Sequence, residues 1–149
     1  MSSIFSKIIA GEIPAYKVAE NDRFLAFLDV NPLCKGHTLV IPKQPVDWLF
    51  DMNDQDLADL NVFAKHVAKA IKACIPCVKV GLAVIGLEVP HAHIHLVPLN
   101  DVADLNFKAP RAQFTPEEFK ATAEAIALLV RVQSSSSKDS EDAMRVRAV

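Results

Sequence analysis

Hydrophobic residues recur at helical spacing in three parts of the chain. The first part, residues 4–9, predicts a short N-terminal helix that ends near Gly11. The longest part runs from residue 54 to about residue 75, where the apolar positions share one face and Asn53 can cap the first turn. The third begins at Thr115, with a proline and a glutamate at the helical positions that favour them, and it runs to about residue 133.

Shorter apolar runs, bounded by turn residues, predict strands. These are residues 16–20, 24–28, 37–41, 78–85 and 91–99. Because the strands are not separated by a regular succession of helices, the pattern favours an α+β fold: an antiparallel sheet of about five strands with one long helix and flanking terminal helices. We expect a single domain over residues 1–133 and a serine-rich, charged tail over residues 134–149.

The composition is that of an ordinary globular protein. Of the 149 residues, 51% are hydrophobic and 23% are charged, and the formal net charge is −2. This charge argues against a nucleic-acid partner, whose phosphates would have to be neutralised, but it allows a small anionic ligand. No stretch reaches the roughly 18 apolar residues of a membrane span, and residues 1–14 lack a secretory signal. We therefore expect a cytoplasmic protein without a membrane partner.

Cys74 and Cys77 form a C-x-x-C pair directly after the long predicted helix. Redox pairs of this kind typically lie at the N-terminus of a helix, and a zinc site would need a second pair of ligands. Simple packing at a helix-to-strand turn is therefore the preferred interpretation.

Three histidines, His91, His93 and His95, alternate with apolar residues. On a strand they would share one face, about 6–7 Å apart along the chain, while the residues between them face the core. Such a row suits either of two chemistries: metal ligation, or phosphate chemistry with one imidazole as nucleophile and the others as donors. The spacing disfavours one metal ion held by all three, although two of them with an outside ligand could still bind one.

The H-x-H-x-H run resembles the signature of the histidine-triad family of nucleotide hydrolases and transferases. Residues 3–15 are similar to the family's N-terminal helix and turn, and residues 27–32 and 36–43 to its ribose-binding loop and the adjoining strand. These segments occur in the expected order and cover most of residues 3–99.

The resemblance implies that His93 attacks the α-phosphorus and forms a covalent nucleotidyl-histidine. It also implies that the backbone carbonyl of His91 orients His93, and that His95 contacts the phosphate or the leaving group. The expected substrate is an AMP-containing purine nucleotide compound, either a nucleoside phosphoramidate or a dinucleoside polyphosphate. The implied nucleotide-binding residues are Phe5, Ile8, Phe27, Asp29, Val30, Asn31, His37, Leu39, Gly86 and Val89. Among them Asp29 would accept hydrogen bonds from the ribose hydroxyls, and His37 would pack beside the triad. For the five apolar positions between Phe5 and Leu39, core packing is an equal alternative.

The chain departs from the family pattern in two places. Leu87 and Glu88 follow Gly86 where the family commonly has a glutamine and a nearby serine. Ser3 and Ser6 stand where many relatives have a cysteine pair that holds structural zinc, so we expect no metal and no other cofactor. A regulatory nucleotide-binding module with little turnover and a metal-dependent hydrolase remain alternatives. The resemblance also implies a homodimer whose sheets join across a twofold axis, with the long helix at the contact.

Overall fold

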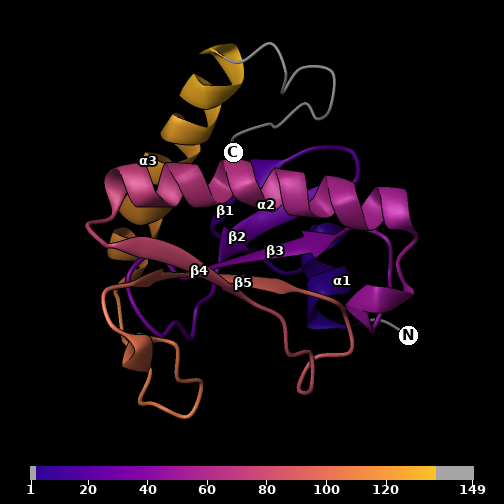
Figure 1. The fold of residues 1–149 in the computed structure, drawn as a ribbon, viewed down its shortest axis with the longest axis horizontal. Helices are drawn as coiled ribbons and strands as arrows, with labels where there is room; N and C mark the ends of the chain where they lie inside the picture. Colours follow the sequence, from indigo (N-terminus) through magenta and orange to yellow (C-terminus); the bar gives the residue numbers. More distant parts are fainter. Residues whose placement is uncertain (1–2, 137–149) are drawn as a thin grey trace.

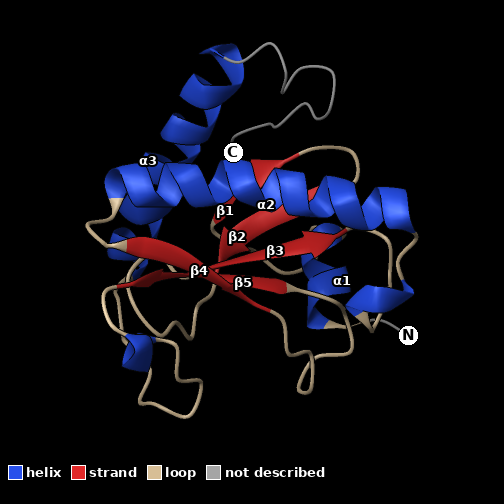
Figure 2. Cartoon of the chain, in the orientation of Figure 1, coloured by secondary structure: helices blue, strands red, loops and turns tan. Residues whose placement is uncertain are grey.

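A five-stranded antiparallel sheet forms the centre of the chain, and helices lie on both of its faces (Figures 1 and 2). The computed structural model describes residues 3–136. In chain order the elements are α1 (Ile4–Ile9), β1 (Lys17–Glu20), β2 (Phe24–Leu28), β3 (Thr38–Pro42), the 3-10 turn η1 (Leu49–Asp51), α2 (Asp54–Cys74), β4 (Lys79–Ala83), β5 (Ile94–Leu99), the 3-10 turn η2 (Val102–Asp104) and α3 (Pro116–Ser136). The strand order is β1-β2-β3-β5-β4, which confirms the predicted α+β fold.

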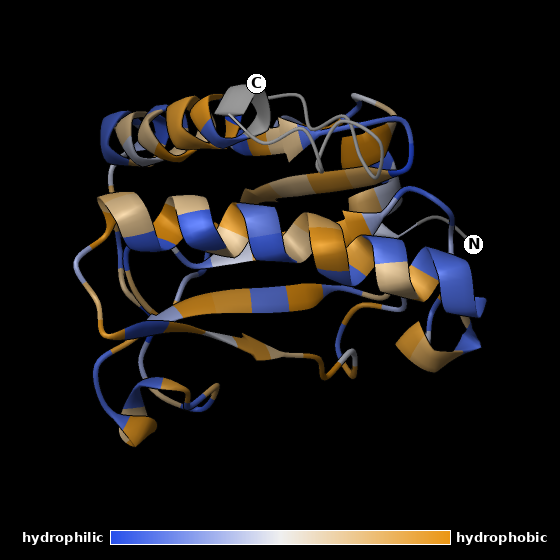
Figure 3. Cartoon of the chain, turned by 45° about the horizontal axis from the view of Figure 1, so that its top comes forward, coloured by the Kyte–Doolittle hydropathy of each residue, from blue (hydrophilic) through white to orange (hydrophobic). Residues whose placement is uncertain are grey.

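Alternating side chains give the sheet two different apolar faces. Along β2, Phe24 and Ala26 belong to the large core beneath α2 and α3, whereas Leu25 and Phe27 belong to a smaller cluster with α1. Figure 3 shows that hydrophobic and hydrophilic residues also alternate along α2. Because α1 has only six residues, about 9 Å of helix, it covers only part of its face of the sheet. His95 belongs to that face, since both of its neighbours in β5 belong to the large core.

The helix starts use the caps that the sequence predicts. The Asn53 side chain accepts a hydrogen bond from the Asp56 amide at 2.8 Å at the start of α2. At the start of α3, the Glu118 amide donates to the Thr115 hydroxyl at 3.1 Å and the Thr115 amide donates to the Glu118 carboxylate at 2.9 Å. This reciprocal pair of bonds is a capping box, and it stabilises the first turn.

The end of α3 differs from the prediction. The helix continues to Ser136 and so includes the first three residues of the predicted tail. Helix propensity outweighs the loop preference of serine there, since a helix that has begun adds residues at little cost. The rest of the predicted tail, residues 137–149, lies outside the described residues.

Within residues 3–136, no helix is both long and apolar enough to cross a membrane. Cys34, Cys74 and Cys77 are half-buried free thiols. Burial raises the pKa of Cys34 and of Cys74, which favours the neutral, unreactive thiol. This environment agrees with a packing role for the C-x-x-C pair.

Candidate active site

The segment that carries His91 and His93 approaches the sheet as an irregular turn. The prediction of a strand from residue 91 is wrong, because β5 begins at Ile94. The His91 amide donates to the Val89 carbonyl at 2.8 Å, and the Ala92 amide donates to the Val46 carbonyl at 2.7 Å. These bonds engage the amides of His91 and Ala92 outside the ladder between strands. All three triad histidines are nevertheless buried and lie close together.

His93 is held by a backbone carbonyl, as the resemblance implies. Its Nδ1 lies 2.7 Å from the His91 carbonyl oxygen, which can only accept a hydrogen bond. In the neutral ring Nδ1 therefore carries the proton, and Nε2 keeps its lone pair. The ring packs edge-on against Phe5, with 5.0 Å between centroids, and lies 4.9 Å from the His95 ring. Both contacts hold the imidazole in one plane, and the Nε2 lone pair lies in that plane.

His91 serves as a support for this arrangement. Its Nε2 donates to the Pro42 carbonyl oxygen at 2.8 Å, at the end of β3. Its Nδ1 lies 3.4 Å from the Ser3 hydroxyl, whose oxygen also accepts a hydrogen bond from the Ser6 amide at 3.1 Å as the N-cap of α1. The His91 side chain thus links α1 to β3, while its carbonyl orients His93.

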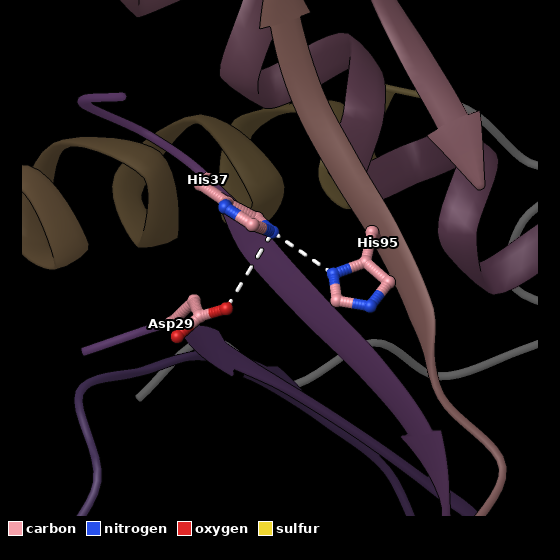
Figure 4. Close-up of side chains that lie close together, drawn as sticks. All are labelled: Asp29, His37 and His95. Atoms are coloured by element: carbon pink, nitrogen blue, oxygen red, sulfur yellow. Dashed lines mark hydrogen bonds and ion pairs between the residues drawn. The ribbon is translucent and has the colours of Figure 1, made fainter. Parts of the chain in front are cut away.

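His37 and His95 form a second pair with fixed tautomers. The Leu33 amide donates to His37 Nδ1 at 3.0 Å, so the proton of the neutral ring is on Nε2. That Nε2 lies 3.0 Å from His95 Nδ1 and donates to it (Figure 4). The remaining proton of His95 is then on Nε2, which is therefore a hydrogen-bond donor.

Gly36 shapes the turn that places His37 directly before β3. Its φ of +93° lies in the left-handed region, which glycine adopts at little cost. A Cβ at this position would also lie 3.0 Å from the Ile75 side chain. The turn therefore requires glycine.

Three of the buried histidines, His37, His91 and His95, have lowered pKa values and are neutral near pH 7. Burial, with the nearby His95 and Arg111, lowers the pKa of His37 to about 3. Burial, with His93 and Arg111, lowers the pKa of His95 to about 4. Burial also lowers the pKa of His91, against the opposite effect of its hydrogen bond to Pro42. At neutral pH these three rings therefore keep the tautomers that their partners select.

Asp29 follows β2 and lies at the edge of the same site. One carboxylate oxygen accepts from the Asn31 amide at 2.8 Å, and the other lies 3.6 Å from His37 Nε2 (Figure 4). Burial raises the pKa of this carboxyl group, against the opposite effects of the Asn31 amide and of the Arg111 and His93 charges. A half-buried carboxylate with one oxygen directed away from its own loop can accept hydrogen bonds from a ligand hydroxyl.

The remaining residues of the implied nucleotide site divide into two groups. Four apolar side chains form one cluster on the face of α1, with Val89 packed against it: Phe5, Ile8, Phe27 and Leu39. By contrast, Val30 is 66% exposed, Asn31 is exposed, and Gly86 has a φ of +72° in an open turn. The four side chains of the first group are at most 7% exposed, so they pack as core, and Phe5 among them also contacts the His93 ring; the second group lies in exposed turns.

Three potential ligand atoms for a metal lie within 4.8 Å of one another, on Asp29, His37 and His95 (Figure 4). The hydrogen bond from the Leu33 amide puts the His37 proton on Nε2, which is the atom that a metal ion would need. A cation there would require either an imidazolate or the loss of that backbone bond. This donor set therefore does not fit a resident metal ion.

The serines that replace a zinc-binding cysteine pair are also unsuited to that metal. Ser3 and Ser6 lie with their hydroxyl oxygens 3.3 Å apart and use them in the helix cap and toward His91. Neutral hydroxyls are poor substitutes for thiolates as zinc ligands. The absence of a structural metal stays a prediction, and these contacts support it.

Two residues that sequence reasoning missed lie against the site. The Phe107 ring packs edge-on against His95, with centroids 4.7 Å apart, and Arg111 contributes a positive charge near Asp29, His37 and His95. Both come from the irregular segment between η2 and α3, which carries no periodicity and no motif. Only the fold brings this segment back to β2 and β3.

Both the sequence and the fold match known proteins. A HIT domain family model matches residues 10–102. The adenosine 5'-monophosphoramidase hnt1 of Schizosaccharomyces pombe is 38% identical over 133 residues, which cover 88% of this chain and all of that protein. The adenosine 5'-monophosphoramidase HNT1 of Saccharomyces cerevisiae is 42% identical over 99 residues, 66% of this chain and 63% of that protein.

A solved structure extends the match to three dimensions. The Zn-bound histidine triad family protein from Mycobacterium smegmatis superimposes with a TM-score of 0.77 at 26% identity, over 92% of this chain and 99% of that one. The family model alone matches more than half of the residues. This chain belongs to the histidine-triad (HIT) family.

Proposed function

We propose that this protein is a nucleotide hydrolase or transferase that cleaves the α-phosphate bond of a nucleoside phosphoramidate or a dinucleoside polyphosphate. The reaction proceeds through a covalent nucleotidyl-histidine on His93. One observation carries the proposal: the His91 carbonyl binds His93 Nδ1 at 2.7 Å and so reserves the Nε2 lone pair for a ligand. The names of the two yeast relatives, adenosine 5'-monophosphoramidases, support an adenosine phosphoramidate as substrate.

The chemistry takes two displacements. The Nε2 lone pair of His93 forms a bond to the α-phosphorus, and the bond from phosphorus to the leaving nitrogen or oxygen breaks with its electron pair on that atom. His95 Nε2–H donates a hydrogen bond to the departing atom. Water then attacks the same phosphorus and releases His93. Over the whole cycle, water supplies a hydroxyl to phosphorus and a proton to the leaving group, so both histidines return unchanged.

The nucleoside portion is held by the groups beside His93. The apolar cluster of Phe5, Ile8, Phe27 and Leu39 offers a surface for a base or sugar that needs no hydrogen bond from the protein. Asp29 accepts hydrogen bonds from the ribose hydroxyls at the rim. Such a site prefers ribonucleotides and makes few demands on the identity of the purine.

A regulatory nucleotide-binding module with little turnover is the second candidate, and the turn before the triad favours it. Leu87 is 88% exposed and offers no polar atom to a phosphate, and the carboxylate of Glu88 follows it. Two measurements on the purified protein separate the candidates: calorimetric binding of AMP, and release of product from adenosine 5'-phosphoramidate and from diadenosine tetraphosphate. The enzyme proposal expects binding together with turnover of at least one substrate. Tight binding of AMP without release from either substrate would support the regulatory module.

A further inference from the structure

The segment between η2 and α3 closes over one side of the histidine cluster. Phe107 lies in this segment, 4.7 Å from the His95 ring centroid and 6.3 Å from the His37 centroid, edge-on to both. Edge-to-face contacts between rings hold their relative orientation as well as their separation. His95 thus contacts the Phe107 ring as well as the His93 ring, which is 4.9 Å from it.

Arg111 fastens this segment at two points. One terminal nitrogen of its guanidinium donates to the Asn31 carbonyl at 3.0 Å, and the other donates to the Phe107 carbonyl at 3.1 Å. The guanidinium carbon lies 5.7 Å from the centroid of the Phe107 ring. A backbone bond of 2.9 Å from the Ala112 amide to the Pro32 carbonyl adds a second connection between the same two loops.

These contacts use the shape of the guanidinium as well as its charge. A planar fork can donate to two carbonyl oxygens at once and lie against an aromatic ring, whereas a lysine ammonium is a single point donor. The two acceptors belong to different loops: Asn31 is two residues from Asp29, and Phe107 touches His95. Arg111 therefore ties the ribose side of the site to the leaving-group side.

We propose that Arg111 is a positioning residue: by joining the carbonyls of Asn31 and Phe107, it keeps Phe107 against His95 and directs His95 Nε2–H toward the leaving group. The inference rests on the proposed function and assigns a role to a residue outside the triad. Arg111 acts through His95. Substitution of Arg111 therefore weakens the help that His95 gives to the departing group, and it leaves the attack by His93 unchanged. The effect of substitution must then depend on how much help the leaving group needs.

The test compares two adenosine substrates in single-turnover kinetics. Adenosine 5'-phosphoramidate with an alkylamine substituent has a poor leaving group, and adenosine 5'-(4-nitrophenyl phosphate) has one that departs without a proton. Arg111→Met and Arg111→Lys should each lower the rate with the amine substrate by about tenfold or more, while the rate with the nitrophenyl ester should change by less than about threefold. His95→Ala should show the same difference between the two substrates, with a larger loss of rate on the amine substrate. Lys108→Met, which removes an exposed charge from the same segment, should match the wild type.

Three results would overturn the inference. Equal losses with both substrates would mean a general structural role, and full activity of Arg111→Lys would mean that a positive charge alone suffices. A higher KM with an unchanged kcat would mark Arg111 as a ligand-binding cation. Phe107→Leu removes the ring contact and keeps an apolar side chain. If an Arg111 variant does not fold, this variant replaces it, and it must lose rate with the amine substrate but not with the nitrophenyl ester. Failure of the proposed function is a separate outcome, since wild-type protein would then turn over neither substrate.

Discussion

Each of the four buried histidines has hydrogen-bond partners that select one tautomer. The His91 carbonyl puts the His93 proton on Nδ1, and the Leu33 amide puts the His37 proton on Nε2. Through His37, the same amide determines that His95 Nε2 is a donor. His93 and His95 therefore lie side by side with complementary tautomers: the neutral His93 ring has its lone pair at Nε2, and His95 has its proton there.

The ribose interaction can be tested at Asp29. Asp29→Ala should weaken the binding of AMP by about 1.5–3 kcal/mol, the range for hydrogen bonds to a charged group. The loss should shrink for 2',3'-dideoxy-AMP, which has no ribose hydroxyls. Isothermal titration calorimetry gives both values, with Asp22→Ala as a control that removes an exposed carboxylate from the hairpin turn at the other end of β2. The same loss for both nucleotides would show that Asp29 acts through the fold.

At the scale of single residues, the motif located the histidine cluster but not its surroundings. The resemblance implied that the His91 carbonyl orients His93 and that His37 packs beside the triad; the structure has both contacts, and the roles stay predictions. The Leu33 amide could not have been found, because every residue except proline carries such a donor. Arg111 and Phe107 were missed because an isolated cation and an isolated ring in a loop have no pattern.

At the scale of elements, local chemistry predicted the starts of helices better than the start of strand β5. Asn53 and Thr115 begin α2 and α3 as expected, because a cap depends on side chains within one turn. The start of β5 at Ile94 depends instead on Val46, whose carbonyl binds the Ala92 amide from a distant part of the chain. Alternation along a sequence cannot reveal such a partner.

The edge strand β4 supports the expected homodimer. β4 pairs only with β5 in the described sheet, and Leu82 in β4 is 50% exposed. An apolar strand at the edge of a sheet readily pairs with a second copy. We expect a dimer in sedimentation experiments at micromolar concentration, and Leu82→Lys should shift it toward monomer. Val102→Lys changes an equally apolar but 93% exposed residue in η2 and should have no effect. A wild-type monomer would contradict the expected assembly.

At the scale of the whole molecule, the buried histidines make stability depend on pH. The pKa is about 3 for His37 and about 4 for His95 in the folded protein, against about 6.5 in the unfolded chain. Between about pH 6.5 and pH 5, the unfolded chain therefore binds more protons than the folded protein. The free energy of unfolding must fall as the pH is lowered through this window. The raised pKa of Asp29 has the opposite effect.

Urea unfolding at about pH 7, 6 and 5 measures this dependence. Each of the two histidines should contribute a loss of up to about 1.4 kcal/mol per pH unit once the unfolded form is protonated. His37→Asn removes one of them and should show a shallower dependence than the wild type. A wild-type stability that stays constant or rises on acidification, or an unchanged slope in the variant, would contradict the assignment of neutral buried rings.

The identity of the nucleophile is the central claim, and one measurement tests it most directly. Protein quenched during turnover of adenosine 5'-phosphoramidate should carry the added mass of a nucleotidyl group, and peptide mapping should place it on His93. His93→Asn should form no adduct and lose nearly all turnover while it keeps most of its affinity for AMP, because the ribose and base contacts lie elsewhere. An adduct on His91 or His95, or a His93→Asn variant that retains more than about a tenth of the wild-type rate, would contradict the account.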